Sequence, residues 1–183
     1  MTSRCIATAV ALLTSLVACS TPPPKPPARV EPAQLGAIKP IHKHGLVYLA
    51  GQPSAADLEA AKAQGVKTVL NLRKKDEPVA FDEAATVAGL GIEYLSLPFG
   101  TPEELTDGVF TQARGVLSNS AKRPLLLHCA SANRVGAVWL AHRVLDQQVP
   151  YADALAEAKE VGLKSAPYEQ RALEYIQSQS AKK

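Results

Sequence analysis

Apolar residues occur in short blocks after about residue 40, and the spacing of these blocks predicts strands that alternate with helices. Four apolar runs of strand length lie at residues 45–51, 66–72, 92–97 and 125–128. Elsewhere, apolar positions recur every three to four residues, which predicts helices at residues 54–64, 78–89, 101–118, 134–148, 151–161 and 168–177. This alternation indicates an α/β fold with three layers, in which helices flank a mostly parallel sheet of four to five strands.

Capping residues mark where two of these helices begin. Ser54, with Asp57 three residues later, forms a variant of the capping box, and Gly65 is placed to end the same helix. Thr101, followed by Pro102 and two acidic residues, predicts the start of the helix that runs to about residue 118. In α/β proteins, ligands bind where loops leave the carboxyl ends of strands, so we expect the functional site among those loops.

The start of the chain has a different character. Residues 1–18 carry Arg4 and then an apolar run without acids, and Leu16-Val17-Ala18-Cys19 resembles the cleavage box of bacterial lipoproteins. We therefore expect a signal peptide over residues 1–18 and lipidation of Cys19, which would anchor the protein to a membrane of the cell envelope, facing the periplasm. An ordinary secretory signal is the alternative. The resemblance to lipoproteins also implies outer-membrane sorting, because Ser20 follows the cysteine.

Prolines are frequent in residues 19–40, which predicts an extended tether that holds the folded part away from the membrane. We expect one folded domain over residues 41–180, a length that can bury a full core. The formal net charge is +3, and basic and acidic residues are interspersed, which argues against a nucleic-acid partner.

The candidate chemistry lies between the fourth apolar run and the helix that follows it. This segment begins with His128 and Cys129, ends with Arg134, and holds four small residues between them: Ala130, Ser131, Ala132 and Asn133. Backbone N–H groups of such a loop, a helix N-terminus and a guanidinium together bind the oxygens of a phosphate or sulfate. The same field favours a thiolate, so Cys129 is expected to be a nucleophile that attacks an anionic group. A buried cysteine without a reactive role is the alternative.

Two upstream motifs extend this segment into a resemblance. With Gly51-Gln52-Pro53 and Val69-Leu70-Asn71-Leu72-Arg73, residues 128–134 resemble the bacterial beta-lactamase-hydrolase-like phosphatase family. The resemblance covers residues 39–177 and extends to dual-specificity and tyrosine phosphatases. It implies a cysteine-phosphatase-like fold and hydrolysis of a phosphate monoester through a phosphocysteine on Cys129, without a metal or other cofactor. The substrate would be a phosphorylated protein or a small phosphate ester.

The resemblance also implies roles for individual residues. Arg134 and the backbone of residues 130–134 would hold the phosphate oxygens, and His128 would order the loop. Arg73 and Gln52 are candidates for the rim of the pocket. Arg73, which shares the loop after the second strand with Glu77, would either bind a second anionic group or pair with an acid.

Three features depart from the pattern of the well-known phosphatases. Four residues separate Cys129 from Arg134, where well-known phosphatases have five, and Val135 replaces the usual Ser or Thr. Residues 97–101 lack the aspartate expected to protonate the leaving group. The nearby acids are Glu103, Glu104 and Asp107, of which Asp107 is the predicted donor.

Two other functions stay open. A rhodanese-like sulfurtransferase would carry sulfur as a persulfide on Cys129, and a catalytically weak module would only bind phosphate. The Gly-Gln-Pro and Asn-Leu-Arg motifs favour the phosphatase over the sulfurtransferase. Nothing in the sequence separates the phosphatase from the binding module.

Overall fold

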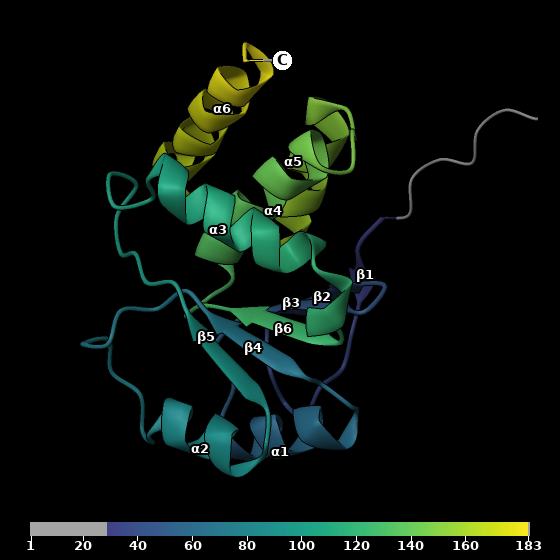
Figure 1. Cartoon of the computed structure of the whole chain (residues 1–183), viewed down its shortest axis with the longest axis vertical. Coiled ribbons are helices and arrows are strands. Elements are labelled where there is room, and N and C mark those ends of the chain that lie inside the picture. Colours follow the sequence, from purple (N-terminus) through teal and green to yellow (C-terminus); the bar gives the residue numbers. More distant parts are fainter. Residues whose placement is uncertain (1–28, 183) are drawn as a thin grey trace, which may run out of the picture.

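The computed structural model describes residues 29–182, in which one mixed sheet has helices on both faces (Figure 1). The order of the strands across the sheet is β1-β2-β3-β6-β4-β5. Their bounds are β1 (Glu31–Pro32), β2 (Ile41–His44), β3 (Val47–Ala50), β4 (Thr68–Asn71), β5 (Glu93–Ser96) and β6 (Leu125–His128). The strands β3, β6, β4 and β5 pair in parallel, while β1 and β2 add an antiparallel edge. The predicted α/β fold with three layers is confirmed, with six strands in this part of the chain.

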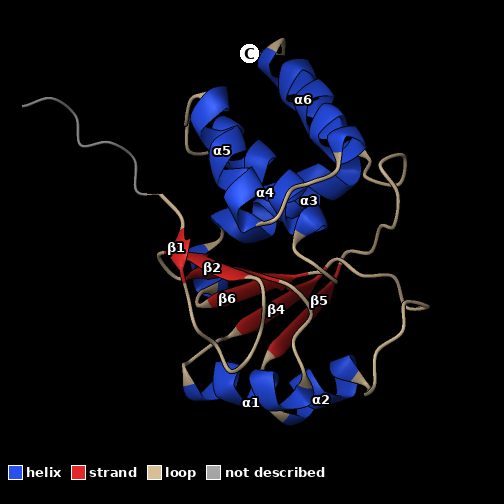
Figure 2. Cartoon of the chain, turned by 180° about the vertical axis from the view of Figure 1, so that it is seen from behind, coloured by secondary structure: helices blue, strands red, loops and turns tan. Residues whose placement is uncertain are grey.

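The helices form the two outer layers. They are α1 (Ala55–Ala63), α2 (Glu83–Gly89), α3 (Asp107–Ser118), α4 (Asn133–Leu145), α5 (Tyr151–Val161) and α6 (Ala166–Ser180). Figure 2 shows α1 and α2 on one side of the sheet and the other four helices on the opposite side. Across residues 29–182, no helix has both the length and the apolar character that a membrane crossing requires.

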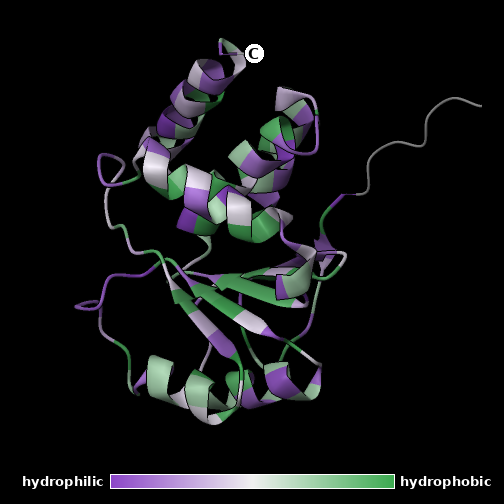
Figure 3. Ribbon diagram, in the orientation of Figure 1, coloured by the Kyte–Doolittle hydropathy of each residue, from purple (hydrophilic) through white to green (hydrophobic). Residues whose placement is uncertain are grey.

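The sheet separates two apolar clusters, because successive side chains of a strand point to opposite faces. In β6, Leu125 and Leu127 belong to the larger cluster around α4, whereas Leu126 belongs to the cluster above α1 and α2. Figure 3 shows the central strands as largely hydrophobic. Helix α4 is buried on nearly all sides, and Trp139 at its middle is fully buried. The loop between β6 and α4 therefore joins two deeply buried elements of the fold.

The folded domain begins earlier than expected. Residues Glu31–Pro32 pair with β2, and Leu35 and Ile38 belong to the cluster on the α1 side of the sheet. The predicted tether over residues 19–40 therefore does not hold for residues 31–40, where β1 and the apolar residues Leu35 and Ile38 attach the segment to the sheet. The predicted signal peptide, Cys19 and the first part of the tether lie outside the described residues.

The two predicted helix starts have different outcomes. The capping box is confirmed, because the Ser54 hydroxyl accepts from the Asp57 N–H at 3.2 Å and the Asp57 carboxylate accepts from the Ser54 N–H at 2.9 Å. The helix expected from Thr101 instead begins at Asp107, with Thr106 as its N-cap. Residues 101–105 form turns, in which the Glu104 carboxylate accepts from the Gly100 N–H at 2.5 Å. Such local bonds from side chain to backbone compete with helix formation.

Candidate active site

Strands on either side of β6 position the loop that carries Cys129. The Cys129 N–H donates to the carbonyl of Ala50 at 3.3 Å, and the Gln52 N–H donates to the carbonyl of Ala130 at 3.1 Å. A Cβ at Gly51 would lie 3.0 Å from the carbonyl oxygen of Lys39 and 3.3 Å from that of Ala130. The Gly51-Gln52 motif therefore lets the end of β3 approach the loop closely.

The start of α4 leaves several N–H groups pointing away from any helical acceptor. Ala132, the N-cap, has a left-handed backbone with φ 62°, and the first helical bond runs from the Gly136 N–H to the Ala132 carbonyl at 2.9 Å. The N–H groups of residues 133–135 precede that bond and have no helical acceptor. Within residues 29–182, the N–H groups of Ala130 and Ser131 also have no backbone acceptor. Together with the helix dipole, these donors form a site suited to an anion.

Cys129 is the buried first residue of this loop. Its side chain is buried, and its thiol is free within the described chain. Ala130 and Ser131, which follow it, are exposed. The buried cysteine is therefore followed directly by residues that reach the surface.

Arg134 is fixed by an acid from another loop. Its Nη1 donates to Glu77 Oε1 at 2.5 Å and to the carbonyl of Phe99 at 2.8 Å, and its Nη2 donates to Glu77 Oε2 at 2.7 Å. Glu77 thus takes the Nη1–Nη2 end of the guanidinium, so the Nε N–H and the second N–H of Nη2 lie along the Nε–Nη2 edge, which Glu77 does not occupy. That edge holds two parallel donors, which match two oxygens of a phosphate.

The electrostatics agree with this pairing. The hydrogen bond from Arg134 outweighs partial burial and, with the Lys74 N–H and Arg73, lowers the pKa of Glu77 to about 2. Burial disfavours the charge of Arg134, but Glu77 and the nearby Cys129 outweigh burial, so the pKa of Arg134 is raised. Both groups are therefore ionised at neutral pH, and Glu77 is a fixed carboxylate.

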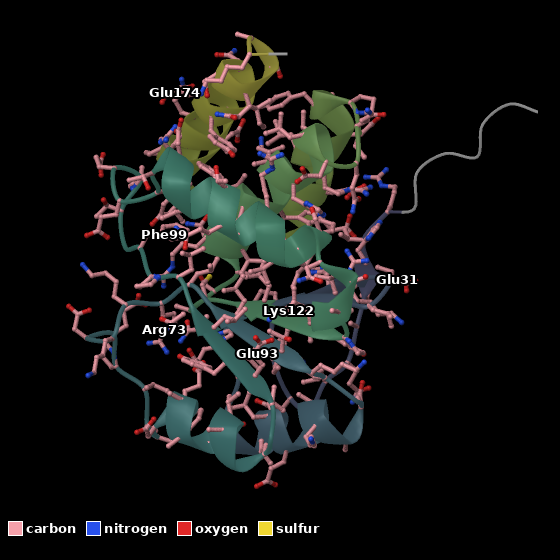
Figure 4. All side chains as sticks on the ribbon, in the orientation of Figure 1. Glu31, Arg73, Glu93, Phe99, Lys122 and Glu174 are labelled. Carbon is pink, nitrogen blue, oxygen red and sulfur yellow. The ribbon has the colours of Figure 1, made fainter. Side chains whose placement is uncertain are left out.

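Arg73 and Gln52 lie behind the loop in a polar network. Arg73 Nε donates to Glu77 at 3.2 Å and its Nη2 donates to the carbonyl of Pro78 at 2.7 Å, while its Nη1 donates to Gln52. Of the two roles predicted for Arg73, the structure shows the pairing with an acid. Figure 4 labels Arg73 and Phe99, which lie on the side of the molecule where the loops after β4 and β5 leave the sheet.

The network continues to His128. Its Nε2 lies 2.8 Å from Glu83 Oε1, and both side chains are buried. Gln52 Nε2 donates to the other oxygen of Glu83 at 2.6 Å. Burial raises the pKa of Glu83, but hydrogen bonds from His128 and Gln52 outweigh it, so the net pKa is lowered. His128 therefore connects the end of β6 to α2, which fits its predicted role in ordering the loop.

A hollow of about 470 Å³ opens above the loop. Ser131, Asn133 and Arg134 line it from below, and it is closed by Lys74, Asp76, Glu77, Pro78, Gly100 and Tyr168. Arg73 and Gln52, which were predicted at the rim, do not belong to this lining; Arg73 lines a neighbouring cavity of about 460 Å³ instead. The Asn133 side chain also accepts from the Lys164 N–H at 2.8 Å, which ties the loop after α5 to the start of α4.

The structure does not bring Asp107 to this hollow. Asp107 lies at the start of α3, where its carboxylate pairs with Arg171 of α6. The acids in the lining are Asp76 and Glu77. Glu83 and Tyr168 were not identified from the sequence, because an acid in the first turn of a helix and an aromatic at helical spacing are common without function.

The family model described as "Beta-lactamase hydrolase-like protein, phosphatase-like domain" matches residues 46–146. The beta-lactamase hydrolase-like protein of Agrobacterium fabrum is 24% identical over 120 residues, which are 63% of this chain and 27% of that protein. The chain thus spans about a quarter of the length of this relative.

Two solved structures share the fold. TpbA of P. aeruginosa is 23% identical with a TM-score of 0.64, and the match covers 84% of this chain and 91% of that one. The core catalytic domain of the PP-IP phosphatase SIW14 of S. cerevisiae is 19% identical with a TM-score of 0.63, covering 84% of this chain and 94% of that one. The family match spans β6, the Cys129 loop and α4, so the chain belongs to the family of the phosphatase-like domain of beta-lactamase hydrolase-like proteins.

Proposed function

We propose that the protein is a cysteine-dependent phosphatase that hydrolyses a phosphate monoester through a phosphocysteine on Cys129. The observation that carries this proposal is the arrangement of the loop. Cys129 is buried at the start of a loop in which the N–H groups of Ala130 and Ser131 have no backbone acceptor within residues 29–182. Arg134 keeps its Nε–Nη2 edge clear of Glu77 and lies close enough to Cys129 for the two to interact. The membership of the chain in a phosphatase-like domain family supports the same reaction.

The chemistry follows from these positions. The Cys129 thiolate attacks phosphorus in line, and the bond between phosphorus and the leaving oxygen breaks. The N–H groups of residues 130–134 and the Nε–Nη2 edge of Arg134 hold the three remaining oxygens. Water then attacks the phosphocysteine, which releases phosphate and restores the thiolate. Phosphoryl transfer depends mainly on positioning and on charge neutralisation, and this loop supplies both.

Glu77 and His128 act on the site through other residues. Glu77 holds the end of the Arg134 guanidinium, so that the free edge keeps one orientation. His128 connects the strand before Cys129 to Glu83, and a buried pair of this kind resists displacement of the loop. Both are positioning residues in this proposal.

The proposed substrate is a phosphorylated protein or a small phosphate ester. A variant of TpbA from P. aeruginosa was solved in complex with pTyr, and SIW14 is named a PP-IP phosphatase. These names concern those proteins and support a phosphate ester as the class of substrate for this chain.

Turnover of an aryl phosphate tests the proposal. We expect the purified protein to release phosphate from p-nitrophenyl phosphate, and we expect Cys129→Ser to abolish release. A parallel incubation with thiosulfate tests the sulfurtransferase, which would add one sulfur to Cys129 without releasing phosphate. Saturable binding of phosphate with no turnover would instead identify a binding module. Val135 gives that outcome a physical basis, because a buried valine follows Arg134 where a hydroxyl would assist the second step.

We further propose that residues 1–18 are a signal peptide and that lipidated Cys19 anchors the protein in the cell envelope, with the outer membrane favoured. The support is the sequence Leu16-Val17-Ala18-Cys19. Metabolic labelling with radioactive palmitate, followed by membrane fractionation, tests this. Label should enter the wild-type protein and not Cys19→Ser. An unlabelled wild-type protein in the soluble fraction would contradict the anchor.

A further inference from the structure

Cleavage of a phosphate ester leaves an oxygen that must take up a proton unless the leaving group is already a stable anion. A positioned acid supplies this proton in the transition state, typically accelerating the reaction by about 10²–10⁴-fold. The acid must reach the hollow above the loop that carries Cys129, because in-line attack places the leaving oxygen on the side of phosphorus opposite the sulfur. The carboxyl groups in that lining belong to Asp76 and Glu77.

Glu77 is unsuited to this task. Arg134 and Arg73 both donate to its carboxylate, and the Lys74 N–H donates to it at 2.7 Å. A carboxylate held by two guanidinium groups cannot turn toward a substrate without breaking both contacts.

The other nearby candidates are also engaged elsewhere. Glu104 accepts from the Gly100 N–H and from Lys74 at 3.1 Å, and these contacts lower its pKa. Asp107 pairs with Arg171. The Tyr168 hydroxyl donates to the carbonyl of Gly100 at 2.9 Å, and burial raises its pKa, which makes it a weaker acid.

Asp76 differs from these groups in both position and engagement. It is exposed in the lining of the hollow, and across residues 29–182 its side chain makes no hydrogen bond or ion pair. Its backbone is nevertheless fixed. The Glu77 N–H donates to the carbonyl of Lys74 at 3.2 Å, and the carbonyl of Pro78 accepts from Arg73. The segment is therefore held on both sides of Asp76 while the carboxyl group stays available.

We infer that Asp76, and not the predicted Asp107, protonates the leaving group in the proposed phosphatase reaction. As the sulfur–phosphorus bond forms and the phosphorus–oxygen bond breaks, the carboxyl proton of Asp76 moves to the leaving oxygen. In the second step, the Asp76 carboxylate takes a proton from the water that attacks phosphorus, and the sulfur–phosphorus bond breaks. Both steps balance without a further reactant. The inference rests on the proposed function.

A series of aryl phosphates whose phenols differ in acidity tests this role. The 2,4-dinitrophenolate leaves without protonation, whereas phenol requires it. We expect Asp76→Asn to lower kcat/KM for phenyl phosphate by about 10²-fold or more and to change that for 2,4-dinitrophenyl phosphate little. Asp153→Asn, an exposed acid on α5, is the matched control and should change neither value.

Each other outcome has a definite meaning. Equal losses on all substrates, or no loss on phenyl phosphate, would overturn the role of Asp76. A selective loss in Tyr168→Phe, with Asp76→Asn unchanged, would overturn it in favour of the tyrosine. If the wild-type protein fails to hydrolyse even 2,4-dinitrophenyl phosphate, or if Cys129→Ser hydrolyses it equally well, the proposed function itself fails.

Discussion

Replacing Glu77 by glutamine tests the pairing that orients Arg134. Glutamine keeps the size of the side chain but removes the charge that two guanidinium groups share. A fall in the pKa of Glu77 from an ordinary 4.5 to about 2 corresponds to ~3 kcal/mol. The Glu77 side chain is 24% exposed. Water therefore screens part of this interaction, and we expect Glu77→Gln to lower the free energy of unfolding by about 1–2 kcal/mol.

The dependence on pH makes this prediction specific. Because the pKa of Glu77 is lower in the folded state, its stabilisation is fully present above about pH 4.5 and is lost as the pH falls toward 2. The difference in unfolding free energy between the wild-type protein and Glu77→Gln should therefore narrow as the pH falls from about 7 to about 3.

Urea unfolding at several pH values measures this difference. Glu160→Gln, an exposed acid on α5, controls for the loss of one negative charge and should show little change at any pH. A Glu77→Gln difference that stays constant across the range would refute the reasoning. So would a variant that is as stable as the wild-type protein near neutral pH.

Three other substitutions probe separate parts of the site. Arg134→Lys keeps the charge but loses the planar pair of donors on the Nε–Nη2 edge, so inorganic phosphate should bind at least about tenfold more weakly in calorimetric titration. An unchanged affinity for phosphate would contradict the role of the Nε–Nη2 edge. Gly136→Ala places a Cβ 2.7 Å from that of Leu163, so the free energy of unfolding should fall by about 1–3 kcal/mol, which an unshifted urea midpoint would disprove. His128→Ala leaves the buried Glu83 carboxylate without its main partner and should cost about 3–5 kcal/mol. Adding Glu83→Gln should recover part of that loss, and a strictly additive double mutant would argue against the pair.

The parts of the fold that the sequence predicts well are those in which local pattern and burial agree. The four apolar runs became β3, β4, β5 and β6, and the helix at Tyr151–Val161 was predicted at its observed bounds. Predictions failed where side chains bond to nearby backbone or where pairing is distant in the chain. Residues 101–105 form turns instead of a helix, and Glu31–Pro32 joins the sheet because it pairs with β2.

The site residues that lie in one continuous loop could be predicted from the sequence, but the contacts between loops could not. Cys129 and Arg134 lie together because one turn connects β6 to α4. The partner of Arg134 comes from the loop after β4, and the partner of His128 comes from the start of α2. A run of charges after Asn71-Leu72 at the carboxyl end of a strand was a signal for Glu77, but it does not reveal which acid an arginine will contact.

The phosphocysteine itself is the central claim, and its capture is the most direct test. The wild-type protein would be mixed with a phosphate ester that carries radioactive phosphorus and quenched during the first turnover, and its peptides would then be sequenced. The account predicts label on the peptide that contains Cys129, formed at the rate at which the leaving group appears, and no label in Cys129→Ser. Release of phosphate with no covalent label during that first turnover, or label on any other residue, would contradict it.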